Sequence, residues 1–366
     1  MDALDEHTAL TTESAEAEPA LELSVIIPAR NEEESLPACL ESLIGQSEPG
    51  FELGREWELL LIDDRSSDAT PAIFAEAAKL PGVRLIEAPV LDTSANSGFT
   101  GKTNACWAAA QAASGELLLF TDADTIHLAG DLSRARHEME KYNVALLSYS
   151  PRQLTSGLVQ RMLMPLVFAE LAVAYPPQRV NLPEDRTAAA NGQFLLVRSE
   201  DYFAVGGHRA VGRKVLEDMA LASNIKRSRR AIRFRYAPDA LSTRMYRTTA
   251  AMIEGWTKNL ALLFPMPIPM ALISMLVFVL AVGLPIFAVS YPFLASWQRP
   301  VLWVVWLRGV WGFLSRVSKS NFPIPDRVLA LFGIPLFVFL LVRSYIQVRV
   351  LKKVEWKGRT YSTTPS

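Results

Sequence analysis

The chain has 366 residues and a formal net charge of -1 at pH 7, which allows two domains, or one domain and a membrane part. Residues 1–20 carry six acids and no Lys or Arg, whereas residues 258–366 carry twelve Lys or Arg and two acids. A basic, apolar C-terminal part favours anionic lipid over nucleic acid, so we expect a membrane partner and no nucleic-acid partner. We expect residues 1–20 to form a disordered acidic tail.

Cys39 and Cys106 are the two cysteines, and both fall in helical patterns that we expect to lie in the cytosol. We interpret them as small packing residues and not as a disulfide pair. The four histidines show no zinc-like spacing with them.

Residues 21–150 alternate between strand and helix patterns. Thr70-Pro71 marks a helix start with Pro in the first turn. Glu32 to Glu34 are expected in the first turn of the helix predicted at 31–44, where the helix dipole favours acids. This rhythm predicts an α/β fold with a doubly wound, mostly parallel sheet. The predicted strands are 23–28, 57–62, 83–86 and 116–120, and a further helix is predicted at 103–113.

Residues 151–250 are less regular. Residues 158–174 are apolar but contain Arg161, Pro165 and Glu170. Two interpretations stay open for this segment: a helix in the membrane interface, or a core helix of the catalytic domain. Further strands are predicted at 193–197 and 232–236.

Apolar segments follow. No charged residue lies between Lys258 and Arg299, which is about twice the ~20 residues that one helical span requires. Residues 328–342 form a second apolar run, and 301–314, which contains three tryptophans, either spans or lies in the interface. The basic residues between and after these runs leave the number of hydrophobic helices open, between two and four. We therefore expect C-terminal transmembrane helices that make a multi-pass anchor.

Two acids, Asp122 and Asp124, directly follow the strand predicted at 116–120. Ligands bind at the carboxyl edge of open α/β sheets. Two carboxylates one residue apart suit a hard divalent cation that also holds a diphosphate. The alternative is a loop with two solvated acids.

Asp63 and Asp64 follow the strand predicted at 57–62. A carboxylate there can accept from a base N–H or a ribose hydroxyl, although an Asp-rich helix cap is the alternative. Gly101-Lys102 opens the next helix, where backbone N–H groups and an ammonium can face phosphate. A solvated Lys is the alternative, because the full P-loop pattern is missing.

Glu217 and Asp218 open a helical pattern, either as a helix cap or as a general base aimed at an acceptor hydroxyl. Arg244 and Arg247 follow a predicted strand and loop. They can hold phosphates through fixed forks, or they form a basic patch that meets lipid headgroups.

These segments, in this order, resemble the family 2 glycosyltransferases with the GT-A fold over roughly residues 21–250. The resemblance implies that Asp64, rather than Asp63, binds the nucleoside. It also implies that Asp122 and Asp124 hold Mn²⁺ or Mg²⁺, and that Asp218 is the catalytic base, beside Glu217. The nucleotide-sugar-binding residues that it implies are Pro28, Arg30, Glu32, Asp63, Asp64, Lys102, Asp122, Arg244 and Arg247.

Within the family, residues 244–247 resemble the start of the (Q/R)-x-x-R-W motif, but Thr248 stands in place of the Trp. This departure puts processive synthesis in doubt. That motif is the one carried by membrane-anchored lipid glucosyltransferases of the ceramide type and by processive synthases. Residues 247–259 and the hydrophobic tail are most similar to hopanoid-associated glycosyltransferases and their carotenoid-modifying relatives.

We therefore expect an inverting, non-processive transfer of a sugar from a UDP-sugar to a membrane lipid hydroxyl. The enzyme is expected in the cell (inner) membrane with its catalytic domain in the cytoplasm. The alternatives are a nucleotidyltransferase acting on sugar phosphates and a non-catalytic membrane scaffold that binds nucleotide sugars. The expected domains are 21–250, with a donor half 21–150 and an acceptor half 151–250, then a membrane anchor 251–350 and a basic tail 351–366.

Overall fold

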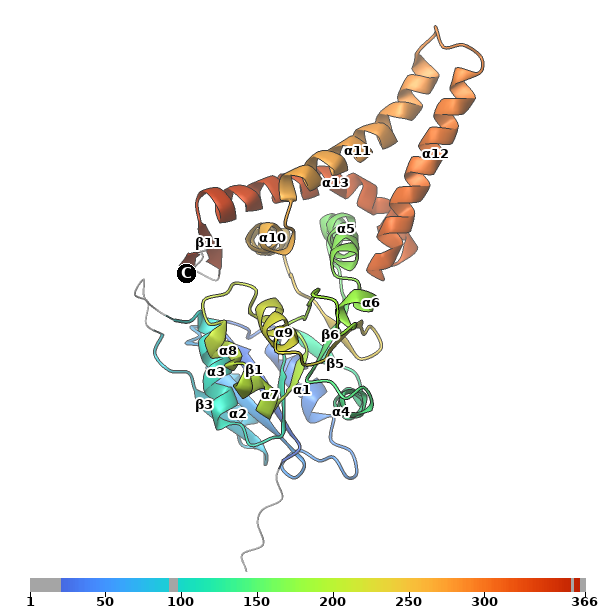
Figure 1. The fold of residues 1–366 in the computed structure, drawn as a ribbon. Helices are drawn as coiled ribbons and strands as arrows, with labels where there is room; N and C mark the ends of the chain where they lie inside the picture. The colour runs from blue at the N-terminus through green and yellow to red at the C-terminus, as the bar shows by residue number, and fades with distance from the viewer. Residues whose placement is uncertain (1–20, 92–97, 357–358, 363–366) are drawn as a thin grey trace, which may run out of the picture.

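The structure is a computed structural model that describes residues 21–91, 98–356 and 359–362. The acidic tail expected at residues 1–20 lies outside the described residues. An α/β part forms one end of the molecule, and the C-terminal helices are stacked on the other end (Figure 1).

The central sheet has seven strands in the order β3-β2-β1-β4-β8-β6-β9. Neighbouring strands are parallel except for β8, which runs antiparallel to both β4 and β6. This confirms the predicted α/β class with a mostly parallel sheet, in the GT-A type. The strands are β1 (Leu23–Ala29), β2 (Trp57–Asp63), β3 (Val83–Glu87), β4 (Leu117–Phe120), β6 (Leu146–Ser150), β8 (Leu195–Arg198) and β9 (Ile232–Tyr236).

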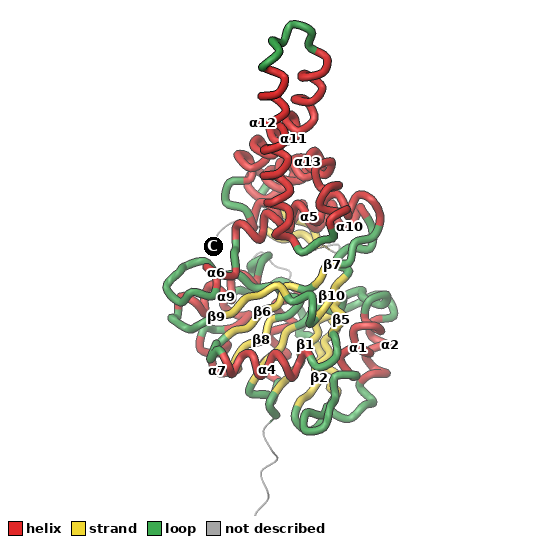
Figure 2. Tube along the Cα trace, turned by 90° about the vertical axis from the view of Figure 1, so that its right-hand side faces the viewer, coloured by secondary structure: helices red, strands yellow, loops and turns green. Residues whose placement is uncertain are grey.

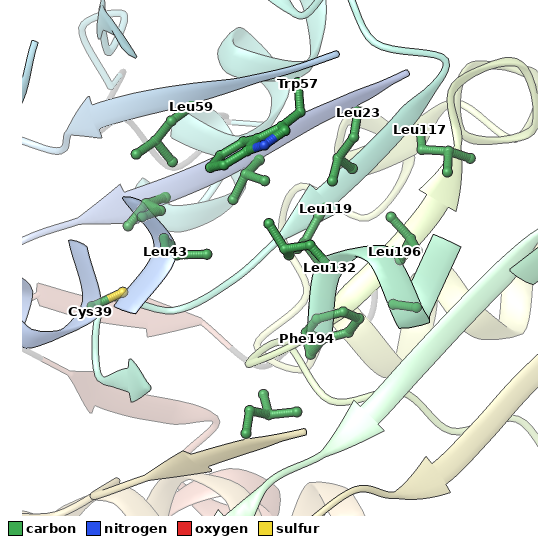
Figure 3. Packing of buried hydrophobic residues seen from close by; sticks show 14 of the residues in the cluster. Leu23, Cys39, Leu43, Trp57, Leu59, Leu117, Leu119, Leu132, Phe194 and Leu196 are labelled. Carbon is green, nitrogen blue, oxygen red and sulfur yellow. The ribbon is translucent and has the colours of Figure 1, made fainter. Parts of the chain in front are cut away.

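Helices cover both faces of this sheet because its buried strands alternate their side chains between two cores. Val25 and Ile27 of β1 belong to one core, and Ile26 belongs to the other. The first core packs on α1 (Leu36–Ile44), α2 (Thr70–Ala77) and α4 (Asp131–Lys141), as Figure 3 shows for Leu43 and Leu132. The second packs on α3 (Gly101–Ala112), α7 (Ser199–Ala204) and α9 (Glu217–Arg227). Both cysteines are free and buried, as predicted.

Helix α1 begins at Leu36, so the helix predicted from residue 31 was wrong in its start. Asn31 has a left-handed backbone (φ 52°), and its side-chain oxygen accepts from Ser67 N at 2.8 Å. This loop is tied to the turn after β2 instead of being wound into a helix. The acids Glu32 to Glu34 therefore do not lie in the first turn of α1, and the dipole argument for them does not hold.

A smaller sheet joins distant loops beside the carboxyl edge of the central sheet. Its strand order is β5-β10-β7, and β10 is antiparallel to β5 and parallel to β7. The strands are β5 (Thr125–His127), β7 (Arg152–Gln153) and β10 (Leu241–Thr243). The loop after β10 is thereby brought next to the loop after β4.

The remaining helices form a third core. Among the described residues, three helices are long and apolar enough to cross a membrane: Gly157–Val180, Pro267–Ser290 and Ile324–Val350. The first contains α5, which packs closely against α13 and shares a core with it. The elements are α5 (Gly157–Ala174), α6 (Pro177–Val180), α8 (Gly207–Ala210), α10 (Thr249–Leu263), α11 (Pro267–Ser290), α12 (Gln298–Val317), η1 (Ser318–Ser320), α13 (Ile324–Tyr345), η2 (Ile346–Val350), β11 (Lys353–Trp356) and β12 (Arg359–Ser362).

Candidate active site

A cavity of about 550 Å³ lies at the carboxyl ends of β1, β2 and β4. Helix α10 and the loops before α9 and after β10 also contribute to its wall. It brings together every site residue expected from the sequence except Asp63. Those residues are Pro28, Arg30, Glu32, Asp64, Lys102, Asp122, Asp124, Glu217, Asp218, Arg244 and Arg247.

The two acids after β2 have different places. Asp64 lines the cavity, and its backbone N–H donates to Ala29 O at 2.8 Å, which holds it against the end of β1. Arg30 donates to the Asp64 carbonyl at 3.0 Å. Both carboxylate oxygens of Asp63 instead accept from Ser66 N at 3.2 Å. Asp63 therefore shapes the turn, and Asp64 is the acid that faces the cavity.

Lys102 lies between two carboxylates. Its ammonium is 2.7 Å from Asp122 Oδ1 and 3.0 Å from Glu217 Oε1. Burial by itself lowers the pKa of Lys102, but the two carboxylates raise it well above its usual value, so the ammonium stays charged. A Cβ on Gly192 would lie 3.0 Å from Lys102 Nζ, so the chain passes close to this charge. Lys102 therefore links the loop after β4 to the start of α9.

Asp122 and Asp124 both line the cavity directly after β4. Among the described residues, no group of three or more His, Cys, Asp or Glu side chains is arranged to hold a metal ion. Two carboxylates nevertheless fit Mn²⁺ or Mg²⁺, because such ions take oxygen ligands and keep places for phosphate and water. A cation here would depend on the ligand for the rest of its coordination.

Asp218 stands at the start of α9 and points back to the chain near β8. One of its carboxylate oxygens accepts from Gly192 N at 2.9 Å, and the other accepts from Met219 N at 2.7 Å. Burial, and then the neighbouring charge of Glu217, raise the pKa of Asp218 to about 6. Burial also acts to raise the pKa of Glu217, but Lys102 more than offsets this and holds it below its usual value. The pair therefore places an acid with a lowered pKa next to an acid whose pKa is raised toward neutral pH.

Arg247 lies at the rim of the cavity. Its guanidinium donates to Glu34 O at 2.8 Å and to Ser35 Oγ at 3.2 Å, and it pairs with the Glu34 carboxylate at 3.1 Å. It therefore joins the loop after β10 to the loop after β1. Arg244 lines the same wall.

Lys258 and Asn259 also line the cavity, and the sequence-based assignment of site residues did not include them. Burial lowers the pKa of Lys258 to about 8, although Glu217, Asp122 and Asp218 act in the opposite direction. Helix α10 can approach because Gly255 lies against the Tyr246 ring, where a Cβ would come within 2.5 Å. The sequence signal that could have identified Lys258 is that it is the one basic residue of a mostly apolar helix pattern, four residues after Glu254.

Three kinds of similarity accompany this geometry. The model of glycosyl transferase family 2 matches residues 24–218. The 4,4'-diaponeurosporenoate glycosyltransferase of Staphylococcus haemolyticus (strain JCSC1435) is 28% identical over 370 residues, covering 95% of this chain and 90% of that protein. The protein of the same name from Staphylococcus aureus (strain MRSA252) is 29% identical over 245 residues, covering 65% of this chain and 60% of that protein.

Two solved structures are similar at lower identity. The mannosyltransferase PcManGT from Pyrobaculum calidifontis, in complex with GDP-Man and Mn²⁺, has a TM-score of 0.48 and 17% identity, covering 89% of this chain and 86% of that chain. S. aureus TarS 1-349 in complex with UDP-GlcNAc has a TM-score of 0.43 and 15% identity, covering 94% of this chain and 98% of that chain.

Proposed function

Since the chain belongs to glycosyl transferase family 2 and is a glycosyltransferase, we propose that it moves one sugar from a UDP-sugar to a membrane lipid. The observation that carries this proposal is the single cavity that gathers the acids of three separate loops with a helix of the C-terminal part. The relatives named for diaponeurosporenoate support a lipid-like acceptor. The hopanoid acceptor that the sequence suggested stays a prediction.

The donor half of the cavity is formed by the loops after β1, β2 and β4. In our proposal Asp64 binds the nucleoside, and Arg244 and Arg247 hold the phosphates. Asp122 and Asp124 would hold Mn²⁺ or Mg²⁺, which supplies Lewis-acid neutralisation of the departing diphosphate. Lys102 keeps the loop after β4 and the start of α9 in register.

Asp218 serves as the general base in this proposal. Its carboxylate takes the proton of the acceptor hydroxyl, and the hydroxyl oxygen forms a bond to the anomeric carbon of the sugar. The bond from that carbon to the phosphate oxygen breaks, and UDP leaves with the electron pair. One displacement inverts the configuration at the anomeric carbon. A pKa of about 6 suits a base that works near neutral pH.

Membrane insertion is favoured by the α11–α12 pair. The thirteen Val, Leu, Ile and Phe residues of α11 favour insertion by roughly 4–8 kcal/mol in total on a scale of about 0.3–0.6 kcal/mol each. Arg308 in α12 opposes insertion by about 2.5–3.5 kcal/mol on a similar scale. The balance supports a multi-pass membrane protein, and the basic residues near the base of the pair support a cytoplasmic catalytic domain.

The sequence departure at Thr248 supports single transfer in place of processive synthesis. In the structure Thr248 is the N-cap of α10, and its side chain accepts from Ala251 N at 3.1 Å. This position therefore begins the helix that carries Lys258, and it does not present an aromatic ring to an acceptor sugar.

The test uses detergent-solubilised protein with Mn²⁺ or Mg²⁺, a panel of nucleotide sugars and a bacterial lipid extract. UDP release and mass spectrometry of the lipids are the readouts. We expect one lipid to gain one hexose and activity to be lost on chelation. Asp122→Asn provides a matched inactive control. No release and no donor binding across the panel would contradict the proposal. Donor binding without release would favour the scaffold that binds nucleotide sugars, whereas a nucleotide joined to a sugar phosphate would favour the nucleotidyltransferase.

A further inference from the structure

We infer that α11 and α12 cross the bilayer as a hairpin, and that α5 and α13 lie along the membrane surface. The helices that contain α5, α11 and α13 are long and apolar enough to cross, whereas α12 is not among them by composition and crosses here as the return arm packed on α11. The inference rests on the membrane attachment in the proposed function, and it reduces the number of crossings among the described helices to two. The partner is a lipid bilayer with anionic headgroups.

Helix α11 has no polar side, whereas α12 carries the exposed Arg308 near its middle. Helix α11 has no charged residue, and its exposed side chains are apolar around the helix, with Leu272 and Val289 about seven-tenths exposed at 68% and 72%. A helix in the interface would need one polar face, and α11 lacks it. Trp306 of α12 donates to Ala281 O at 2.8 Å, which joins the two helices near mid-length. Figure 2 shows the connection between them at the end of the molecule farthest from the sheet.

The base of the hairpin is fixed on the catalytic side. Arg316, near the end of α12, makes a two-point ion pair with Glu170 of α5 at 2.5 and 2.6 Å. Glu170 is buried, so this contact is part of the protein interior. The chain therefore returns to the level of α5 before α13 begins.

Both ends of α13 are also tied to the catalytic side. In its first turn Asp326 pairs with Arg161 of α5 at 2.7 Å. In its last turn Ser344 Oγ accepts from Ala261 N of α10 at 2.8 Å. Between these points, a Cβ on Gly333 would meet Met162 O of α5 at 2.2 Å, so α13 lies directly on the α5 backbone. A helix seated along its length in this way does not carry its two ends to opposite faces of a bilayer.

Helix α5 is held in the same manner. Gln160, in its first turn, donates to Tyr246 O at 3.0 Å. Tyr175, at its C-terminal end, donates to Leu263 O at 2.6 Å. Both partners flank or belong to α10, so α5 and α10 form a layer on which α13 rests (Figure 1).

The outer side of α13 carries an apolar stripe at helical spacing. Its side chains are exposed, from Ile324 at 71% to Phe332 at 54% and Ile346 at 44%. The stripe consists of Ile324, Val328, Phe332, Phe339 and Val342 of α13 and Ile346 at the start of η2. Arg343, Arg349 and Lys352 are exposed near its end, where they can meet anionic headgroups. An apolar stripe flanked by basic residues fits a helix half-sunk in the membrane surface.

The charge distribution agrees with two crossings. Arg316 and Lys319 lie at the base of the hairpin, and Arg349, Lys352 and Lys353 follow α13. Two crossings keep both groups on the side of the catalytic domain, as the positive-inside rule requires. Three crossings would place the second group on the opposite side. Helix α10, which borders the cavity through Lys258, then lies directly beneath the membrane-facing layer, so the lipid reaches the cavity from the adjacent leaflet.

The test places single cysteines by the substitutions Glu140→Cys, Ser296→Cys, Ser318→Cys and Arg349→Cys. All four positions are exposed, and the native Cys39 and Cys106 are buried, so the parent protein measures the background. Intact and permeabilised bacterial cells are treated with a membrane-impermeant maleimide. We expect Ser296→Cys to react in intact cells and the other three to react only after permeabilisation.

The outcomes separate this inference from the proposed function. Reaction of Arg349→Cys in intact cells, with Glu140→Cys protected, would show that α13 crosses and would overturn the inference. Protection of both Ser296→Cys and Glu140→Cys in intact cells would show that the hairpin does not cross and would also overturn it. The inverse pattern, with Ser296→Cys alone protected, supports two crossings and contradicts the cytoplasmic catalytic domain. UDP release by each variant tests the activity independently of its labelling.

Discussion

The carboxyl edge of the central sheet and the C-terminal helices differ in how directly sequence predicts position. In the sheet, parallel register places the ends of β1, β2 and β4 side by side, so acids after these strands meet in one cavity. In the C-terminal part, α11 and α13 are both apolar enough to span, yet α11 is almost wholly exposed and α13 is seated on α5. Regular strand pairing therefore determines where a motif at a strand end lies in the fold. Hydropathy shows that a helix is apolar, but it does not show whether its apolar face contacts protein or lipid.

The substitution Asp218→Asn is the strongest test of the active site that we place at the carboxyl edge of the sheet. Asn keeps an oxygen that can accept from Gly192 N but cannot serve as the base. We expect the turnover number to fall about 10²–10⁴-fold while donor affinity is kept. Single-turnover transfer and titration with UDP-sugar measure the two quantities. Undiminished transfer would remove Asp218 from the base role and would favour an acceptor with no proton to lose, such as a carboxylate.

The pH profile sharpens the same assignment. Because burial raises the pKa of Asp218 to about 6, its reactive carboxylate predominates above that pH and is protonated below it. We expect transfer to decrease roughly tenfold for each pH unit below about 6 and to level off above it. Measurement of kcat/KM from pH 5 to 7.5 checks this, with donor binding followed in parallel. A kcat/KM that does not change between pH 5 and 6 in the native enzyme would show that Asp218 does not control the reaction in this range.

Gly333→Ala tests the other side of the comparison, the seating of α13. The added Cβ would collide with the Met162 carbonyl, and separating the helices should lower the free energy of unfolding by about 1–3 kcal/mol. Gly312→Ala in α12 is the matched control, because nothing lies within 4 Å of its added Cβ. Thermal unfolding in detergent measures both. Equal unfolding temperatures for the two variants would contradict the close contact between α13 and α5.

Lys258→Met joins the two regions, because this side chain reaches the cavity from α10. Removal of a partly buried ammonium that lines the cavity near Asp122 should weaken donor binding about 10–100-fold. Lys258→Arg should recover part of the affinity, since it restores the charge. Lys319→Met, an exposed Lys at the base of the hairpin, is the control and should bind donor normally. Donor binding unchanged in Lys258→Met would separate α10 from the donor site.

The smallest expected effect is on donor affinity, and it distinguishes Asp64 from the adjacent Asp63. Asp64→Asn should weaken donor binding by up to about tenfold, as expected for the loss of one charged contact. Asp63→Asn keeps an oxygen that accepts from Ser66 N, and it should leave donor affinity unchanged. Calorimetric titration with UDP is sensitive enough for this comparison. A larger loss in Asp63→Asn than in Asp64→Asn would reverse the assignment made from the cavity.

By itself, the sequence determined the elements and the order of the site segments. Buried strands have continuous apolar runs, and acids or Gly-Lys at their ends or at helix starts stand out against them. This is why β9 was predicted with its observed bounds, and why Asp122, Asp124 and Asp218 were expected in one site. The start of α1 was misplaced because Asn31 is tied by its side chain to the turn after β2, a contact between residues 36 positions apart.

Only the tertiary structure decided the contacts that depend on distant segments. It brought Lys258 into the cavity and placed Lys102 between two carboxylates. It also seated α13 on α5 through Gly333, although the composition of α13 alone allows a span. Local patterns encode which residues are apolar or charged. Which segment packs against a given face of a helix or strand is determined by contacts between parts of the chain that are far apart in sequence. A short window of sequence does not contain that information.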